Sequence, residues 1–137
     1  MTSKEYLSQA FYLNRQIKAK QKRLEWLRDI APGPTVRFTD ELRGPGNPRS
    51  SLVENAALKV VELEEEIASD IMKLVEITKD IESVIRAVDS IEYRTLLEMR
   101  YLGFMDWDEI ASRMGYSPRN VFYVHSRAIR TVHIPAA

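Results

Sequence analysis

Residues 51–88 contain no glycine or proline, and apolar side chains recur along them at intervals of three and four residues. This spacing predicts one amphipathic α-helix, which at 38 residues would be about 57 Å long. A single apolar stripe of that length cannot bury itself, so this helix needs a partner helix. The predicted stripe consists of Val53, Ala57, Val60, Leu63, Ile67, Ile71, Leu74, Ile77, Ile81, Val84, Ile85 and Val88.

The simplest partner is the N-terminal segment, which ends at Pro32 and for which Ser3 is a suitable N-cap. It has its own seven-residue repeat, in which only Lys20 is polar: Tyr6, Ala10, Leu13, Ile17, Lys20, Leu24 and Leu27. Clusters of proline and glycine make residues 32–50 a loop. We therefore expect an antiparallel, coiled-coil-like hairpin over residues 1–89.

Charge is distributed unevenly although the chain as a whole is neutral. Residues 1–31 carry seven Lys and Arg against three Asp and Glu, whereas residues 51–89 carry four against ten. Opposite charges across the seam favour pairing of these two helices over self-pairing of the acidic one. The second helix is longer than the first, so its remaining stripe would pack on the C-terminal module or on a second copy in a homodimer.

Residues 90–137 change character, and three short helices can be drawn there. The first covers Ile91 to Leu102 and is closed by Gly103. The second begins after Asp106, which with Glu109 forms a capping box, and buries Trp107, Ile110, Ala111 and Met114. The third follows Gly115, Ser117 and Pro118, and runs to about Val132 with Val121, Val124, Ala128 and Val132 inward. A short helix, a glycine-bearing turn and a capped helix are typical of a helix-turn-helix.

The residues of this module resemble region 4 of bacterial sigma-70 factors, in the runs Tyr93–Leu102, Trp107–Ala111, Met114–Ser117 and Val121–Ala128. More closely, the whole chain resembles small phage and prophage proteins of Gram-positive bacteria, which include regulators of the ArpU and RinA type and sigma-like relatives of unknown function. The resemblance implies an all-α fold, in which the helical hairpin precedes a three-helix, sigma region 4-like module. It also implies that the last helix, 118–132, enters the DNA major groove.

The outward positions of that helix are the expected DNA contacts. Arg119 offers paired donors to guanine and Asn120 suits adenine, and Tyr123, Ser126 and Arg127 follow on the same face. Arg113 and Arg130 are the expected phosphate contacts. Residues 113–137 contain four arginines and no acid, so the local field is positive. We expect Phe122 to pack, and His125 to be a buried histidine hydrogen-bonded to a backbone carbonyl of a neighbouring helix.

Catalytic and metal chemistry find no support in these residue types. The chain has no cysteine and only two histidines, and no phosphate-binding glycine loop is present. Asp106, Asp108 and Glu109 are explained by helix capping and the helix dipole. We expect no cofactor, no membrane span and no secretory signal, and hence a protein of the bacterial host cytosol associated with the nucleoid.

The sequence therefore predicts a DNA-binding transcriptional regulator of phage or prophage type. Two alternatives stay open. The module could contact RNA polymerase with weak DNA affinity, which its net charge of only +1 over residues 90–137 would suit. Alternatively, the chain could belong to a DNA-packaging assembly like the small terminase subunits, which combine a helix-turn-helix with helical oligomerisation.

Overall fold

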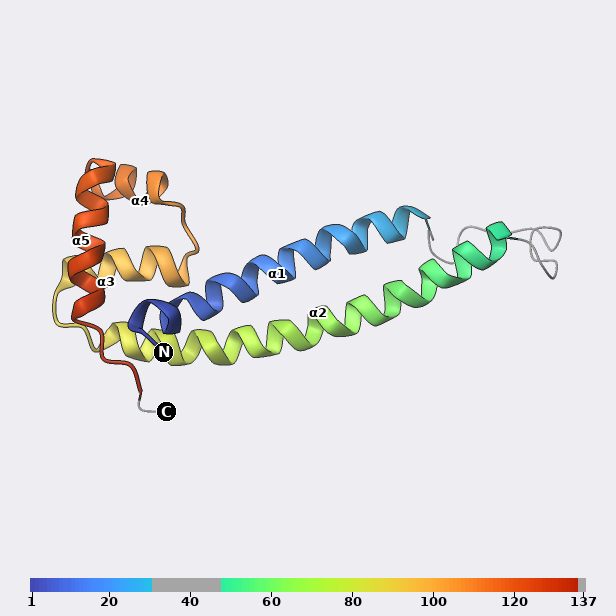
Figure 1. Ribbon diagram of the computed structural model, residues 1–137, viewed down its shortest axis with the longest axis horizontal. Helices are drawn as coiled ribbons and strands as arrows, with labels where there is room; N and C mark the ends of the chain where they lie inside the picture. The colour runs from blue at the N-terminus through green and yellow to red at the C-terminus, as the bar shows by residue number, and fades with distance from the viewer. Residues whose placement is uncertain (31–47, 136–137) are drawn as a thin grey trace. The chain divides into compact units, whose positions relative to one another are not determined.

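The computed structural model describes residues 1–30 and 48–135, with side chains from residue 51 onward in the second range. This part of the chain is all-α and contains no strand (Figure 1). The expected loop at 32–50 lies outside the described residues, except that its last three residues already belong to the second helix. The elements in chain order are α1 (Ser3–Ile30), α2 (Pro48–Arg86), α3 (Ile91–Leu97), the π-helical turn η2 (Glu98–Leu102), α4 (Trp107–Met114) and α5 (Pro118–Arg130).

Two compact units share the long helices. One unit joins Met1–Asn14 to Lys73–Ala137, and we call it the α5 unit; the other, Arg15–Met72, is the hairpin unit. The first turns of α1 and the end of α2 therefore group with the C-terminal helices, whereas the sequence alone suggested a division near residue 90. None of the helices described is both long enough and apolar enough to cross a lipid bilayer.

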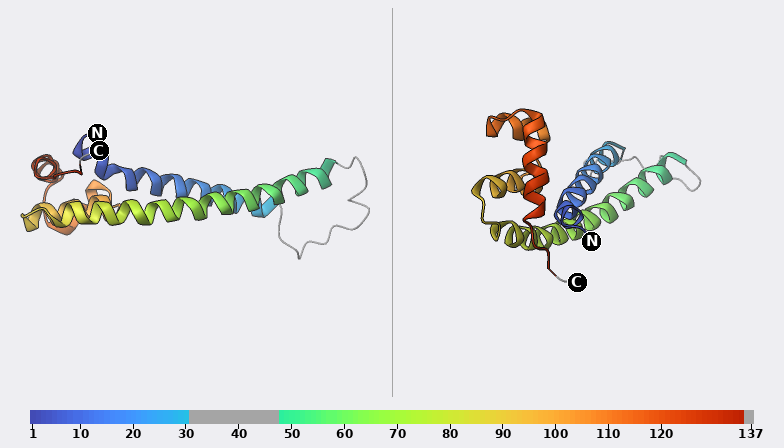
Figure 2. Two further views of the ribbon diagram at one scale, coloured as in Figure 1. Left: turned by 90° about the horizontal axis from the view of Figure 1, so that it is seen from below. Right: turned by 60° about the vertical axis from the view of Figure 1, so that its left-hand side comes forward.

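In the hairpin unit, α1 and α2 run antiparallel and side by side (Figures 1 and 2). Their buried apolar side chains are Ile17, Leu24, Leu27, Ala56, Leu63 and Ile67. The prediction that Ala57 belongs to this seam is wrong, because Ala57 is exposed and Ala56 is buried. The buried residues Ala56, Leu63 and Ile67 follow one another at steps of seven and four, as in a heptad repeat. The helical period therefore buries Ala56 and leaves its neighbour Ala57 exposed.

At one heptad position of the seam, α1 and α2 contribute a polar pair, Lys20 and Asp70, in place of apolar side chains. Lys20 Nζ donates to Asp70 Oδ2 at 2.6 Å, and Glu66 lies 3.7 Å from the same ammonium group. Asp70 is buried at 9% exposure, whereas Ile71, the expected seam residue, is 41% exposed. The hydrogen bond to Asp70 raises the pKa of Lys20. The prediction for Ile71 is therefore wrong, because α2 turns an acid toward the one polar heptad position of α1.

The first core cluster of the α5 unit joins four segments. Leu7 and Ala10 of α1 pack with Ile81, Val84, Ile85 and Val88, with Leu97 and Tyr101, and with Ala128 and Val132. The hydroxyl group of Ser3 also donates to the backbone carbonyl of Val132 at 3.5 Å. The start of α1 is thus held against the end of α5 by both apolar contact and a hydrogen bond.

A second cluster holds α4 and α5 on α3, through Leu96, Ile110, Ala111, Val121 and Val124. Asp106 Oδ1 caps α4 by accepting from the backbone N–H of Glu109 at 2.8 Å. Gly115 then adopts φ = 71°, a left-handed conformation that ends α4 and lets the chain turn into α5. Four residues of α4 were expected to be buried. Ile110 and Ala111 are buried, whereas Trp107 and Met114 are only half-buried.

Several helix ends differ from the sequence prediction. Thr2 rather than Ser3 caps α1, accepting from the backbone N–H of Glu5 at 3.2 Å. Gly103 closes its helix as expected, but its φ is −87° rather than left-handed, and the positive φ falls on Phe104, at 56°. A Cβ on Gly103 would instead lie 2.9 Å from the carbonyl oxygen of Met99, so a steric limit explains this glycine. The long helix ends at Arg86 rather than Val88, and α5 at Arg130 rather than Val132.

Candidate nucleic-acid interface

Helix α5 is amphipathic, and its first turn is well fixed. Ser117 Oγ accepts from the backbone N–H of Asn120 at 3.2 Å, and Pro118 occupies the first turn, where a missing N–H costs nothing. The buried side of the helix carries Val121, Val124, His125 and Ala128. A helix anchored in this way offers its opposite side as a rigid surface.

All five residues predicted to read bases lie on that opposite side and are exposed: Arg119, Asn120, Tyr123, Ser126 and Arg127. Of these, Tyr123 is a large aromatic with 58% of its surface exposed. Arg130, a predicted phosphate contact, is exposed one turn beyond Ser126. We call this set of six residues the α5 face. Their common orientation follows from the helical period, and their contact with bases stays a prediction.

Arg127 is held in place by two tyrosines. Its guanidinium group donates to Tyr123 Oη at 2.6 Å and lies 5.5 Å from the centre of the same ring. Hydrogen bonding to Tyr123 and also to Tyr93 raises the pKa of Arg127. A shallow hollow of about 450 Å³ forms here, lined by Tyr93, Tyr123, Ser126, Arg127, Arg130 and Thr131. The arginine is therefore presented in a restricted set of orientations, which reduces the entropy lost when it binds a ligand.

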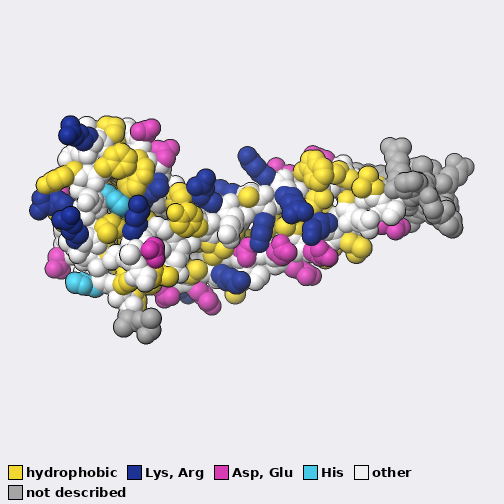
Figure 3. Space-filling model, viewed as in Figure 1, with side chains coloured by type: hydrophobic (Ala, Val, Ile, Leu, Met, Phe, Trp, Pro, Cys, Tyr) yellow, Lys and Arg dark blue, Asp and Glu magenta, His cyan; other side chains and the backbone are white. Residues whose placement is uncertain are grey.

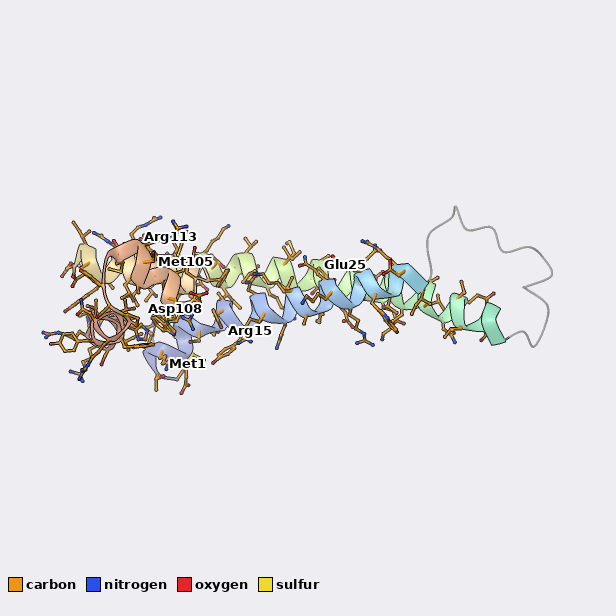
Figure 4. The ribbon with its side chains drawn as sticks, turned by 90° about the horizontal axis from the view of Figure 1, so that it is seen from above. Met1, Arg15, Glu25, Met105, Asp108 and Arg113 are labelled. Atoms are coloured by element: carbon orange, nitrogen blue, oxygen red, sulfur yellow. The ribbon has the colours of Figure 1, made fainter. Side chains whose placement is uncertain are left out.

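Arg113, the other predicted phosphate contact, lies on a different helix from the α5 face. It lies on α4, as does Asp108 (Figure 4), and its guanidinium group donates to Glu109 at 3.3 Å. Arg130 therefore shares a helix face with the base-reading set, whereas Arg113 lies on the preceding helix and pairs with Glu109. The Glu109 side chain, expected to complete the capping box, pairs with Arg113.

Aromatic side chains cover the junction between α4 and α5. Phe122 is 51% exposed, yet its ring centre lies 5.2 Å from that of Trp107. The packing expected for Phe122 is therefore present on one side of the ring only. Arg100 is sandwiched between the rings of Phe11 and Trp107, at 4.5 Å and 4.3 Å from their centres. Two cation–π contacts of Arg100 therefore link Phe11 of α1 to Trp107, the first residue of α4.

His125 is buried under the α5 face, with 8% exposure. Its Nε2 lies 2.6 Å from the hydroxyl oxygen of Tyr101, so its partner is this side chain and not the backbone carbonyl we expected. Burial lowers the pKa of His125 to about 4, helped by the charges of Lys4 and Arg100. Burial also raises the pKa of Tyr101 to about 12. At neutral pH both groups are therefore uncharged, and a hydrogen bond between neutral partners joins them.

Two residues at the edges of the α5 face were not identified from the sequence. Tyr93, predicted as part of the sigma-like run but not as a DNA contact, borders the hollow beside Arg127. Lys4 lines a second hollow of about 380 Å³ together with His125, Ser126, Ile129 and Arg130. The tyrosine hydroxyl was a possible signal for the first. No feature of the sequence around Lys4 indicates that it lies beside α5, because the two are more than 100 residues apart along the chain.

Basic side chains, lysine and arginine in one colour, gather over α5 in the space-filling view (Figure 3). Arg119, Arg127 and Arg130 all lie on this helix, which contains no Asp or Glu. The exposed acids Asp106, Asp108 and Glu109 lie at the start of α4. The α5 face therefore combines positive charge with amide, hydroxyl and phenol groups, a set that can bind phosphates and hydrogen-bond base edges.

The comparisons with known proteins give one match. Residues 48–133 match the family described as Protein of unknown function (DUF1492). No curated protein and no solved structure matches the chain. The matched range covers α2 through α5 and includes the whole of the α5 face, so the family shares the elements that carry this site. The chain belongs to the DUF1492 family.

Proposed function

We propose that the chain is a sequence-specific DNA-binding protein that regulates transcription, with α5 in the major groove of double-stranded DNA. One observation supports this proposal most strongly. The α5 face sets Arg119, Asn120, Tyr123, Ser126, Arg127 and Arg130 on the exposed side of a helix whose other side is packed. With 13 residues, α5 is about 20 Å long. The major groove, about 12 Å wide, admits a helix of this kind.

The residues divide into two roles. Arg119 and Asn120 lie in the first turn of α5, where a recognition helix meets base edges. Arg130 lies in the last turn, and its position suits a phosphate. Arg127 and Tyr123 act as one hydrogen-bonded pair between them. The assignment to phage or prophage regulation depends on the resemblance of the chain to small phage and prophage proteins of Gram-positive bacteria.

The exposed apolar side chains of α2 support a homodimer as the binding form. In the hairpin unit, Leu58, Val61 and Met72 are 65%, 55% and 67% exposed and lie outside the seam with α1. A second copy covering them would hold two α5 faces together, which raises the affinity through effective concentration. Light scattering should give the mass of a dimer; a ring of many copies would favour a DNA-packaging role instead.

Electrophoretic mobility shift with duplex DNA tests the proposal. The full chain should retard a duplex selected from a random pool, and the retardation should weaken steeply as salt is raised. A chain that fails to retard any duplex at low salt but co-purifies with RNA polymerase would contradict DNA binding. That result would support the second candidate, a polymerase-binding module, which the half-exposed Phe122 ring and the modest charge of residues 90–137 favour.

A further inference from the structure

The second hollow of the α5 unit lies between the first turn of α1 and the second half of α5. Lys4 comes from α1, and His125, Ser126, Ile129 and Arg130 come from α5. Two of the five lining side chains are cationic and none is acidic. Ser126 and Arg130 belong also to the α5 face, so the hollow opens beside the proposed DNA surface.

Lys4 is fixed relative to α5 by the packing around it. Ser3, its neighbour, donates to the carbonyl oxygen of Val132 at 3.5 Å. Leu7, one turn further along α1, is fully buried in the same cluster as Ala128 and Val132. The ammonium group also acts on His125, since its charge contributes to the lowered pKa of that residue. Lys4 is therefore a fixed neighbour of α5 rather than a lysine on an unrelated surface.

The α5 face has a different neighbour on each side. Side chains turn by about 100° per residue along a helix. Seen from Ser126 and Arg130, Arg127 and Thr131 therefore lie to one side, and His125 and Ile129 lie to the other. The first side meets Tyr93 in the larger hollow, and the second meets Lys4. Lys4 thus extends the cationic surface of α5 across its width.

We propose that Lys4 binds a DNA phosphate beside the one bound by Arg130, which makes the first turn of α1 part of the DNA interface. This inference rests on the proposed function. A DNA strand bordering the major groove presents successive phosphates, and a protein that neutralises several of them releases the counterions that they hold. The ammonium group of Lys4 and the guanidinium group of Arg130 flank one hollow and can bind neighbouring phosphates. Lys4 carries no sequence information in this role.

The test compares Lys4→Ala with Lys18→Ala, which removes the same charge from an exposed position of α1 in the hairpin unit. Association constants are measured from 50 to 300 mM salt on a selected duplex and on a scrambled one. Lys4→Ala should weaken binding to both duplexes equally. The slope of log K against log salt, which is negative, should become shallower by about one. Lys18→Ala should retain the parental slope, and Lys4→Arg should restore it.

The outcomes separate this inference from the proposed function. If the parent binds DNA with a steep salt dependence and Lys4→Ala has the same slope, the role of Lys4 is wrong while DNA binding stands. If the parent does not bind, both are wrong. An NMR titration of His125 checks the geometry without DNA: its pKa should rise in Lys4→Ala and not in Lys18→Ala. An unchanged pKa of His125 in both variants would place Lys4 away from α5 and overturn the inference.

Discussion

The hydroxyl oxygen of Tyr101 lies 2.6 Å from Nε2 of His125, and both side chains are buried between η2 and α5. The pair gives α5 a polar anchor directly under its exposed face. Because burial lowers the pKa of His125 to about 4, the histidine stays neutral and shares an uncharged hydrogen bond with the tyrosine hydroxyl group. No buried polar side-chain atom of the described residues lacks a hydrogen-bond partner.

The His125 pKa predicts a loss of stability in weak acid. Below about pH 6.5 the unfolded chain binds a proton at this histidine, whereas the folded chain does not until about pH 4. The free energy of unfolding should therefore fall as the pH falls through this window, by about 2 kcal/mol at pH 5. Urea unfolding at several pH values measures it. His133→Ala, which removes an exposed histidine, should retain this pH dependence, and His125→Phe should lose it.

The Lys20–Asp70 pair predicts coupling across the hairpin. Lys20→Met should lower the melting temperature, because it leaves the Asp70 carboxylate without its partner in a largely apolar seam. Adding Asp70→Leu should restore much of the loss, since the seam then becomes apolar throughout. The exposed pair Arg28–Glu64, 3.2 Å apart, is the control. Arg28→Met with Glu64→Leu should show almost no coupling, and equal coupling in the two pairs would contradict this account.

The two glycines before and after α4, Gly103 and Gly115, should respond differently to substitution. Gly115→Ala should destabilise the chain by about 1 kcal/mol, because φ is 71° while the space around a Cβ is open. Gly115→Asn should cost less, since asparagine tolerates this conformation. At Gly103 the limit is the nearby carbonyl oxygen of Met99, so Gly103→Asn should be no better than Gly103→Ala. Thermal unfolding of the four variants decides whether the two glycines differ.

The sandwich of Arg100 between Phe11 and Trp107 predicts that lysine cannot replace this arginine. A planar guanidinium group stacks on both rings, and Arg100 also donates to the carbonyl oxygen of Met105 at 2.9 Å. Arg100→Lys should lower the free energy of unfolding by about 1–2 kcal/mol. Arg86→Lys changes an arginine in an exposed pair with Glu82 and should have little effect. A loss as large at Arg86 would contradict the role of stacking.

Sequence periodicity predicted the helices and the α5 face because both depend on local geometry. The 100° step along α5 orients its exposed residues whatever lies beneath them. The same reasoning failed at Ile71 and Ala57, because it followed apolar identity and did not anticipate that Asp70 would enter the seam to meet Lys20. It also missed Lys4 at α5, because that contact joins segments separated by more than 100 residues and depends on the tertiary packing of Leu7 and Ser3.

The central claim is that the α5 face reads DNA sequence, and the ratio of affinities for a selected and a scrambled duplex tests it most directly. For the parent this ratio should be large, and Arg119→Ala with Asn120→Ala should reduce it about 10-fold or more, since each bidentate base contact contributes about 1–3 kcal/mol. Arg23→Ala with Gln21→Ala, which changes exposed residues of α1, should leave the ratio unchanged. A double variant of Arg119 and Asn120 that discriminates as well as the parent would contradict the account.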